Sequence, residues 1–267
     1  MTQVKQWVAG TPRLVNRQFV GPIPYCEGCH HPVFQKLVCE VLDELGIGEK
    51  AIMVVGVTCG GMAANLMQVD VVGTAHGRAP DVATAIKRVK GGKPIVFTLQ
   101  GDGDCIAIGA ESLIHAGARA EKITIFMINN ANYGTTGGQL APTTIMGQVT
   151  STTPRGRDIE AGLPINAPAL LAPLSGVAYA ARGALCTPAY LQRTRKYITT
   201  AFQKQIDGVG LSFVEVLSPC PPNWHMTPLD CLRWIEEKMI PEFPLGEYKN
   251  VDSINQAPIE PPEARTS

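Results

Sequence analysis

Four short apolar runs, rich in β-branched residues, alternate along the chain with longer segments of helical pattern. The runs are residues 51–57, 95–99, 123–128 and 211–217. The segments with helical patterns are residues 33–45, 80–89, 106–118 and 188–205. Short runs that are apolar throughout are typical of parallel strands buried on both faces. We therefore predict an α/β fold with a doubly wound, mostly parallel sheet and helices on both sides.

The composition narrows the class of protein. The chain has 267 residues, of which 45% are hydrophobic and 17% charged, and its formal net charge is zero. This length suits one or two globular domains. The balanced charge argues against nucleic-acid or membrane-surface partners, which select for an excess of basic residues. No apolar stretch reaches the length of a membrane span or a signal peptide, so we expect a cytoplasmic protein.

The distribution of proline predicts three segments. Residues 1–24 contain several prolines and no sustained period, which is typical of an extended lead-in. Residues 25–240 hold the alternating runs and form the predicted domain. Residues 241–267 are rich in proline and poor in apolar residues, so we expect a tail that wraps a partner or is loose.

Two loops follow neighbouring predicted strands and carry oxygen ligands. The first is Gly101-Asp102-Gly103-Asp104, and the second begins at Asn129. Twenty-five residues lie between Gly103 and Asn129, enough for one helix and one strand, so both loops emerge at the same edge of the sheet. A Mg²⁺ ion could be held there by Asp102, the Asn130 side chain and a carbonyl near Asn132. The alternative is two unrelated turns, since Gly-Asp-Gly is a common turn sequence.

This pairing resembles the thiamine diphosphate signature, in which Gly-Asp-Gly is followed by Asn-Asn. The resemblance implies a thiamine diphosphate-binding fold over residues 25–240, with Mg²⁺ bridging the cofactor phosphates. It also implies that His76 contacts cofactor or substrate in a catalytic role, whereas the simpler alternative is a core histidine. The implied cofactor-binding residues are Thr58, Cys59, His76, Gly101, Asp102, Gly103, Asp104, Asn130, Asn132, Gly134, Thr135 and Thr136.

The eight cysteines sharpen the resemblance, because in a reducing compartment they are thiols, metal ligands or core residues. Cys26, Cys29, Cys59 and Cys220 look like the cluster ligands in the thiamine-binding β subunit of 2-oxoacid:ferredoxin oxidoreductases. Four thiolates suit a 4Fe-4S cluster. The resemblance runs from Tyr25 to about residue 248 and includes residues 76–80, 101–104, 136–144 and 243–246. For the remaining cysteines we expect buried, unliganded positions: Cys39, Cys105, Cys186 and Cys231.

The chain departs from the family pattern near the first two cysteines, where Glu27, His30 and His31 replace the usual residues. Thr58-Cys59-Gly60 likewise replaces the usual Gly-Cys-Ser. These changes concern the surroundings of the cluster and thus its potential and the accepted substrate. Cys26 to His30 is also literally a c-type haem attachment motif, and Cys26, Cys29, His30 and His31 could form a zinc site. If the family resemblance holds, His30 and His31 either contact the cluster ligands without binding the cluster or pack in the protein interior.

The family resemblance implies the oxidative decarboxylation of a 2-oxoacid to acyl-CoA and CO2, with electrons passed to ferredoxin. In thiamine enzymes a glutamate on a second, similar domain activates the aminopyrimidine, and this chain has room for only one such domain. We therefore expect an α or fused αγ subunit as partner, together with coenzyme A and a ferredoxin or ferredoxin-like subunit. Residues 243–246 and the short chain favour a branched-chain 2-oxoacid over 2-oxoglutarate or pyruvate. The competing classes are a non-redox thiamine decarboxylase subunit and an iron-sulfur or haem electron carrier.

Overall fold

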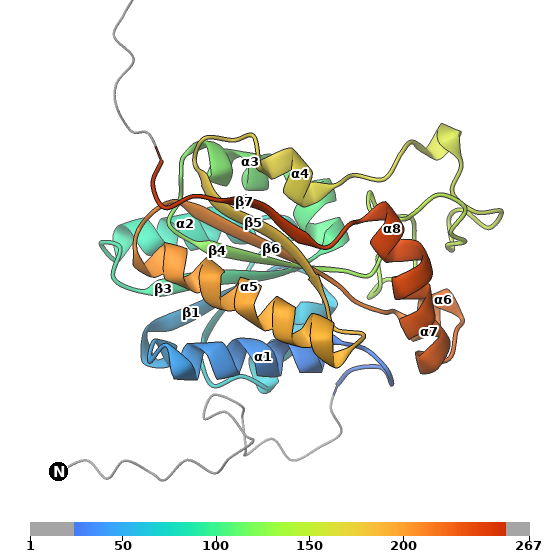
Figure 1. Cartoon of the computed structure of the whole chain (residues 1–267), viewed down its shortest axis with the longest axis horizontal. Helices are drawn as coiled ribbons and strands as arrows, with labels where there is room; N and C mark the ends of the chain where they lie inside the picture. The colour runs from blue at the N-terminus through green and yellow to red at the C-terminus, as the bar shows by residue number, and fades with distance from the viewer. Residues whose placement is uncertain (1–23, 255–267) are drawn as a thin grey trace, which may run out of the picture.

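The computed structural model describes residues 24–254, which form one seven-stranded sheet between two layers of helices (Figure 1). The strand order is β2-β1-β3-β4-β6-β5-β7, and every neighbouring pair is parallel except β5 and β7. The predicted doubly wound, mostly parallel α/β sheet is confirmed. The strands are β1 (Ala51–Val55), β2 (Asp70–Gly73), β3 (Ile95–Gly101), β4 (Thr124–Asn129), β5 (Val177–Ala184), β6 (Leu211–Leu217) and β7 (Gly246–Asn250).

Each face of the sheet buries its own apolar cluster under its own helices. Helices α1 (His31–Glu44) and α5 (Pro188–Ile206) cover one face, and α2 (Ala79–Val89), α3 (Ala110–Ala118) and α4 (Ala167–Leu171) cover the other (Figure 1). Under α1 and α5, Phe126 meets Phe34, Phe97 and Phe202 edge-on. Such pairs lock the helices at defined positions on the sheet.

A third, smaller cluster lies beyond the carboxyl ends of the strands. It buries Trp224, Ile235 and Phe243 from the short C-terminal helices. These helices are α6 (Pro221–Trp224), α7 (Pro228–Trp234), the π-helix η5 (Ile235–Met239) and α8 (Ile240–Glu242). The remaining short helices are η1 (Gly48–Lys50), η2 (Cys59–Asn65), the π-helix η3 (Gly103–Ile108) and η4 (Ile159–Ala161). No helix within residues 24–254 is long and apolar enough to cross a membrane.

Three strands have no counterpart among the predicted runs. Strand β2 is short and half-buried, and β5 is rich in alanine and contains a fully buried arginine, Arg182. Strand β7 pairs antiparallel with β5 within the segment expected to be a tail. Residues 1–23 of the expected lead-in and residues 255–267 of the expected tail lie outside the described residues.

The strand order creates a switch point between β1 and β3. From β1 the chain continues to β2 on one side, whereas β3 is followed by β4 on the other side. The loops after these two adjacent strands therefore diverge, and a crevice opens at their carboxyl ends, the usual ligand position in such sheets.

A long connection, residues 140–166, leaves the sheet edge and projects from the body as an arm (Figure 1, yellow-green). Arg157 is almost completely buried inside this arm. Its guanidinium donates to six main-chain carbonyl oxygens, those of Ala141, Pro142, Thr144, Ala161, Gly162 and Leu163. The arm is thus folded around one charged side chain, while Val149, Ile159 and Leu163 are exposed.

Candidate active site

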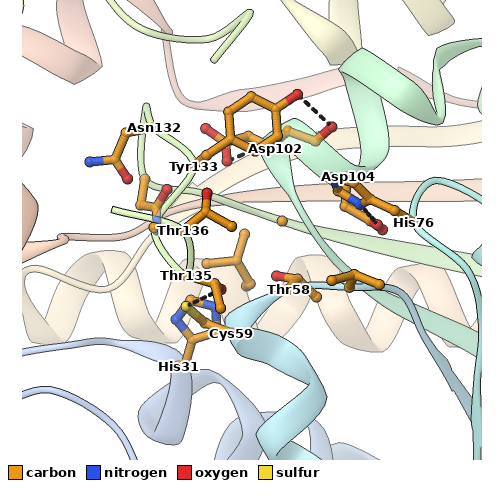
Figure 2. Close-up of a pocket in the computed structure, with 16 residues that line it drawn as sticks. His31, Thr58, Cys59, His76, Asp102, Asp104, Asn132, Tyr133, Thr135 and Thr136 are labelled. Carbon is orange, nitrogen blue, oxygen red and sulfur yellow. Dashed lines mark hydrogen bonds and ion pairs between the residues drawn. The ribbon is translucent and has the colours of Figure 1, made fainter. Parts of the chain in front are cut away.

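The crevice at the switch point is a pocket with a cavity volume of about 90 Å³, called the polar pocket here (Figure 2). It is formed by the loops that follow β1, β3 and β4, together with His76 and His31. The lining residues are His31, Val57, Thr58, Cys59, His76, Gly101, Asp102, Gly103, Asp104, Ile128, Asn130, Asn132, Tyr133, Gly134, Thr135 and Thr136.

Asp102 places a buried carboxylate on the pocket wall. Its side chain is only 2% exposed and accepts hydrogen bonds from the Gly103 amide, at 3.0 Å, and from the Thr143 hydroxyl. Burial raises the pKa of Asp102 to about 7, although the two hydrogen bonds oppose the shift. Asp102 forms no ion pair with any residue between 24 and 254. The carboxylate is therefore held in position but lacks a cation.

Asn130 and Asn132 bring two further oxygen atoms to the same pocket. Both side chains are buried, and neither Oδ1 atom has a hydrogen-bond partner among the described residues. A buried polar atom without a partner costs about 1–3 kcal/mol. Two amide oxygens with unused acceptor capacity thus lie around the pocket, together with the carboxylate of Asp102.

His76 and Asp104 form a second polar pair on the pocket wall (Figure 2). Asp104 is buried, and its Oδ1 contacts His76 Nδ1 and accepts from the Gly77 amide at 2.8 Å. Its other oxygen accepts from Gln100 Nε2 at 2.7 Å. Asp104 is therefore fixed from several sides and orients the half-buried imidazole of His76.

Glycine is required where the loops pass close to these groups. A Cβ atom on Gly103 would lie 2.2 Å from the Tyr133 ring, and one on Gly56 would lie 2.1 Å from the Asp104 carboxylate. A Cβ on Gly101 would lie 2.8 Å from the Thr58 hydroxyl. Since Tyr133 and Asp104 are themselves packed, a larger side chain at these glycines would deform the pocket.

A second pocket, called the cysteine pocket here, adjoins the first. Its cavity volume is about 100 Å³, and its lining includes Cys26, Cys29, Cys59 and Cys220. Cys26 and Cys29 flank the turn before α1, Cys59 begins η2, and Cys220 precedes α6. Three segments that are distant in sequence therefore present four thiols to one cavity.

The thiols differ in their surroundings. Burial raises the pKa of Cys29 to about 12 and that of Cys220 to about 11. Cys29 Sγ lies 3.1 Å from His31 Nδ1, and Cys220 Sγ accepts from Asn223 Nδ2 at 3.3 Å. Within residues 24–254, no three His, Cys, Asp or Glu side chains converge as ligands of a single metal ion.

The two pockets share a wall made of His31, Cys59, Asn130 and Gly134. Cys59 Sγ lies 3.0 Å from Thr135 Oγ1 of the polar pocket. The polar and thiol sites are therefore in direct contact.

The comparisons with known proteins agree with this geometry. Residues 57–216 match the family described as thiamine pyrophosphate enzyme, C-terminal TPP binding domain. The ketoisovalerate oxidoreductase subunit VorA of Methanothermobacter thermautotrophicus is 43% identical over 227 residues, which is 85% of this chain and 47% of VorA. The 2-oxoglutarate synthase subunit KorB of Archaeoglobus fulgidus is 33% identical over 240 residues, which is 90% of this chain and 82% of KorB. This chain belongs to the β-subunit family of 2-oxoacid:ferredoxin oxidoreductases.

A solved structure of 2-oxoglutarate:ferredoxin oxidoreductase from Magnetococcus marinus has the same fold as this chain. The TM-score is 0.73 at 21% identity, over 91% of this chain and 89% of the other. That protein was determined with 2-oxoglutarate, coenzyme A and succinyl-CoA bound. The present chain spans about half the length of VorA.

The oxygen-bearing residues of the polar pocket fit a cation that binds together with thiamine diphosphate. The unpaired oxygens of Asn130 and Asn132 and the unpaired charge of Asp102 form an oxygen donor set of the kind that Mg²⁺ prefers. The four cysteines line one cavity, and thiolates are the ligands that iron-sulfur clusters use.

Every residue predicted to bind the cofactor lines the polar pocket, and all four predicted cluster ligands line the cysteine pocket. Their roles as ligands stay predictions. Cys39, Cys105 and Cys231 are buried as expected, whereas Cys186 is only partly buried. The residues that sequence analysis did not assign to the polar pocket are His31, Val57, Ile128 and Tyr133. Of these four, only Tyr133 could have been predicted from the sequence, because it directly follows the Asn-rich loop.

Proposed function

We propose that this chain is the catalytic β subunit of a 2-oxoacid:ferredoxin oxidoreductase that uses thiamine diphosphate, Mg²⁺ and one 4Fe-4S cluster. The reaction converts a 2-oxoacid and coenzyme A into acyl-CoA and CO2, and passes the two released electrons to ferredoxin. The observation that carries the proposal is the common wall between a pocket of unpaired oxygens and a pocket of four thiols.

The polar pocket would bind the diphosphate end of the cofactor. Asp102, Asn130 and Asn132 would hold Mg²⁺, and Gly101 and Gly103 leave room for the phosphates beside the main chain. Bound thiamine diphosphate supplies the nucleophilic carbanion and accepts the electrons released by decarboxylation. The protein's own contribution is to bind and orient the cofactor and to bury its charge.

His76 is the residue of this chain best suited to hold a proton beside the substrate. Its Nδ1 is engaged by Asp104, which leaves Nε2 as the exchangeable position of an imidazole that lines the pocket. A fixed carboxylate partner sets the orientation and tautomer of the ring. We assign His76 the catalytic proton-handling role and Asp104 the role of positioning it.

The cysteine pocket would hold the cluster through Cys26, Cys29, Cys59 and Cys220. Cys59 and the shared wall bring the thiol site next to the cofactor, a short path for electrons leaving the cofactor. Hydrogen bonds to cluster sulfurs tune the reduction potential, and Asn223 donates to the Cys220 thiol. The reducing conditions that such a site requires favour a cytoplasmic location.

A partner subunit is needed for turnover. The residues that line the polar pocket include no glutamate. The group that activates the aminopyrimidine would lie on a second domain, which we assign to an α or fused αγ subunit. Ferredoxin or a ferredoxin-like subunit would take the electrons from the cluster.

The substrate we favour is a branched-chain 2-oxoacid such as ketoisovalerate. The VorA relatives are 41–43% identical to this chain, whereas the KorB relatives are 30–34% identical. No lysine or arginine lines the polar pocket, so within the described residues the second carboxylate of 2-oxoglutarate has no cationic partner. Val57 and Ile128 instead offer apolar contacts.

The decisive experiment is an anaerobic assay of the assembled complex with a panel of 2-oxoacids, following ferredoxin reduction that depends on coenzyme A. We expect the highest kcat/KM with ketoisovalerate and no turnover by this chain alone. A preference for 2-oxoglutarate or pyruvate would overturn the substrate assignment only. Turnover by the isolated chain would overturn the need for a partner.

Two measurements on the purified complex separate the competing classes. A complex that decarboxylates without iron would be a non-redox thiamine enzyme. A complex with iron or haem but no bound thiamine diphosphate would be an electron carrier. The proposal requires both the cofactor and about four iron atoms at the cysteine pocket.

A further inference from the structure

A fully buried arginine connects the C-terminal segment to the centre of the sheet. Arg182 on β5 donates to the Pro244 carbonyl at 3.2 Å and to the Tyr248 hydroxyl, and its guanidinium stacks 5.0 Å from the Phe243 ring centre. It also donates to Asn166, the residue that caps α4, at 2.7 Å. The motif at residues 243–246 thus surrounds Arg182, and none of its residues lines the polar pocket.

Arg182 pairs with a carboxylate on the next strand. Glu215 on β6 is its register partner, and the two side chains form an ion pair at 2.8 Å. Both are essentially inaccessible to solvent, with exposures of 0% and 1%. A charge buried this deeply is retained only when its partner is held in place.

Glu215 continues the chain of contacts to the end of β4. Its Oε1 accepts from Asn129 Nδ2 at 2.6 Å, and Asn129 Oδ1 accepts from the Ala131 amide at 2.9 Å. Asn129 is fully buried. The side chain of Asn129 is therefore the link between the ion pair and the loop that carries Asn130 and Asn132.

Ala131 is the point at which that loop is strained. Its φ is +55°, in the left-handed region that costs a residue with a Cβ about 1–2 kcal/mol. Asn129 holds its amide, while the Thr144 hydroxyl and Gln148 Nε2 donate to its carbonyl at 2.7 and 3.1 Å. This unusual conformation separates Asn130 from Asn132, whose unpaired oxygens both line the polar pocket.

We propose that Arg182, Glu215 and Asn129 form a positioning relay that keeps Ala131 left-handed and so holds Asn130 and Asn132 in the geometry that accepts a cation. The relay rests on the proposed function, since it presumes a cation beside Asp102. None of its three residues lines the polar pocket, so they act through the loop and not by contact with a ligand.

The test compares variants of the full chain by the affinity for Mn²⁺ added with thiamine diphosphate, read by electron paramagnetic resonance. Asn129→Leu cuts the link to Ala131 while leaving the Arg182–Glu215 pair in place. We expect about a tenfold loss of Mn²⁺ affinity, the size seen when a group that orients a metal ligand is removed. We also expect faster amide exchange at Ala131 in the chain without cation.

The rescue and the control distinguish positioning from general stability. Glycine adopts φ near +55° without strain, so adding Ala131→Gly to Asn129→Leu should restore most of the lost affinity. Phe213→Leu removes core volume from the same strand as Glu215 but breaks none of the hydrogen bonds or the ion pair of the relay, and should leave Mn²⁺ affinity unchanged. Arg182→Met tests the far end of the relay and should weaken Mn²⁺ binding, as Asn129→Leu does.

Each outcome decides a different claim. The relay would be overturned if Asn129→Leu bound Mn²⁺ as tightly as the parent, or if Phe213→Leu lost as much Mn²⁺ affinity as Asn129→Leu. It would also be overturned if adding Ala131→Gly did not restore the affinity. If Arg182→Met does not fold, the Asn129 and Ala131 variants still decide the question. If the parent chain binds no Mn²⁺ with thiamine diphosphate, the proposed function fails together with the relay. Parent binding that is lost in Asp102→Ala but kept in Asn129→Leu would overturn the relay alone.

Discussion

The polar pocket and the cysteine pocket share a wall, but different parts of the chain hold them. In the polar pocket, the loops after three adjacent strands present Asp102, Asn130 and Asn132, and buried hydrogen bonds fix their backbone. In the cysteine pocket, three separated segments contribute four thiols, and Cys26 is exposed. The first pocket is preorganised by the sheet, whereas the thiols of the second lie on segments with no strand in common.

The largest expected effect tests the preorganised pocket. Asp102→Ala should weaken binding of thiamine diphosphate with Mg²⁺ by at least about 100-fold, because it removes the only carboxylate of the proposed ligand set. Calorimetry on the assembled complex measures this loss. Retention of parent-like affinity would show that the cofactor does not bind through this loop.

The cysteine pocket should respond to the loss of any one of its thiols. Alanine at Cys26, Cys29, Cys59 or Cys220 should remove most of the iron from a complex that otherwise holds about four atoms at this site. Cys39→Ala is the matched control, since Cys39 is buried in α1 away from the pocket. Iron analysis and visible absorbance report the result, and equal losses from Cys39→Ala and Cys220→Ala would contradict the ligand set.

A smaller effect tests how tightly the polar pocket is built. Gly103→Ala would force a Cβ to within 2.2 Å of the Tyr133 ring, so one of the two must move. Overpacking of this kind costs about 1–3 kcal/mol, which corresponds to a loss of cofactor affinity of roughly tenfold to a hundredfold. Gly73→Ala is the control, because nothing lies within 4 Å of its added Cβ. Equal affinities in the two variants would mean that the loop adjusts freely.

The polar pocket should become less stable as the pH rises in the absence of ligands. Burial raises the pKa of Asp102 in the folded chain to about 7 from an ordinary value of 3.8. The protonated form is thus favoured by folding, and its contribution is lost as the pH rises from about 4 to about 7. Relative to Asp102→Asn, the parent's free energy of unfolding should fall by up to about 1.4 kcal/mol per pH unit over this window. Urea unfolding at several pH values measures the difference, which should be reduced when Mg²⁺ and thiamine diphosphate are present.

His31, beside the cysteine pocket, should make the protein less stable as the pH falls. Burial lowers the pKa of His31 to about 4 from an ordinary value of 6.5, so its contribution to stability is present above pH 6.5 and lost as the pH falls toward 4. In His31→Phe, the free energy of unfolding should therefore fall less steeply as the pH decreases, by up to about 1.4 kcal/mol per pH unit. The exposed His225 provides the control variant, His225→Gln. Equal acid profiles for parent and His31→Phe would show that His31 does not contribute.

The difference between the pockets also explains what the sequence could predict. Four strands were expected from apolar runs, and the loops after β3 and β4 belong to the polar pocket because carboxyl ends of parallel strands meet at one edge. The cysteine pocket could be anticipated only by resemblance, since no periodicity connects Cys26 to Cys220. Strand β5 was missed because its alanines and buried Arg182 lack the β-branched pattern of a strand.

The contacts that position the loops were beyond sequence reasoning. Glu215 lies 86 residues from Asn129, and their contact depends on the strand order. Residues 243–246 favour a branched-chain substrate by resemblance alone, and no local pattern predicts that Phe243 and Pro244 contact Arg182. Buried polar partners follow from the assembled sheet, so local patterns do not reveal them.

Arg157 makes the path of the arm less dependent on the other side chains of this segment. Its guanidinium donates to main-chain carbonyls, which every amino acid supplies. Other side chains still tie the base of the arm to the polar pocket, because Thr143 donates to Asp102, and Thr144 and Gln148 donate to the Ala131 carbonyl. Sequence change in the arm is therefore constrained at Arg157 and at this base, and is freer at exposed positions such as Val149 and Ile159.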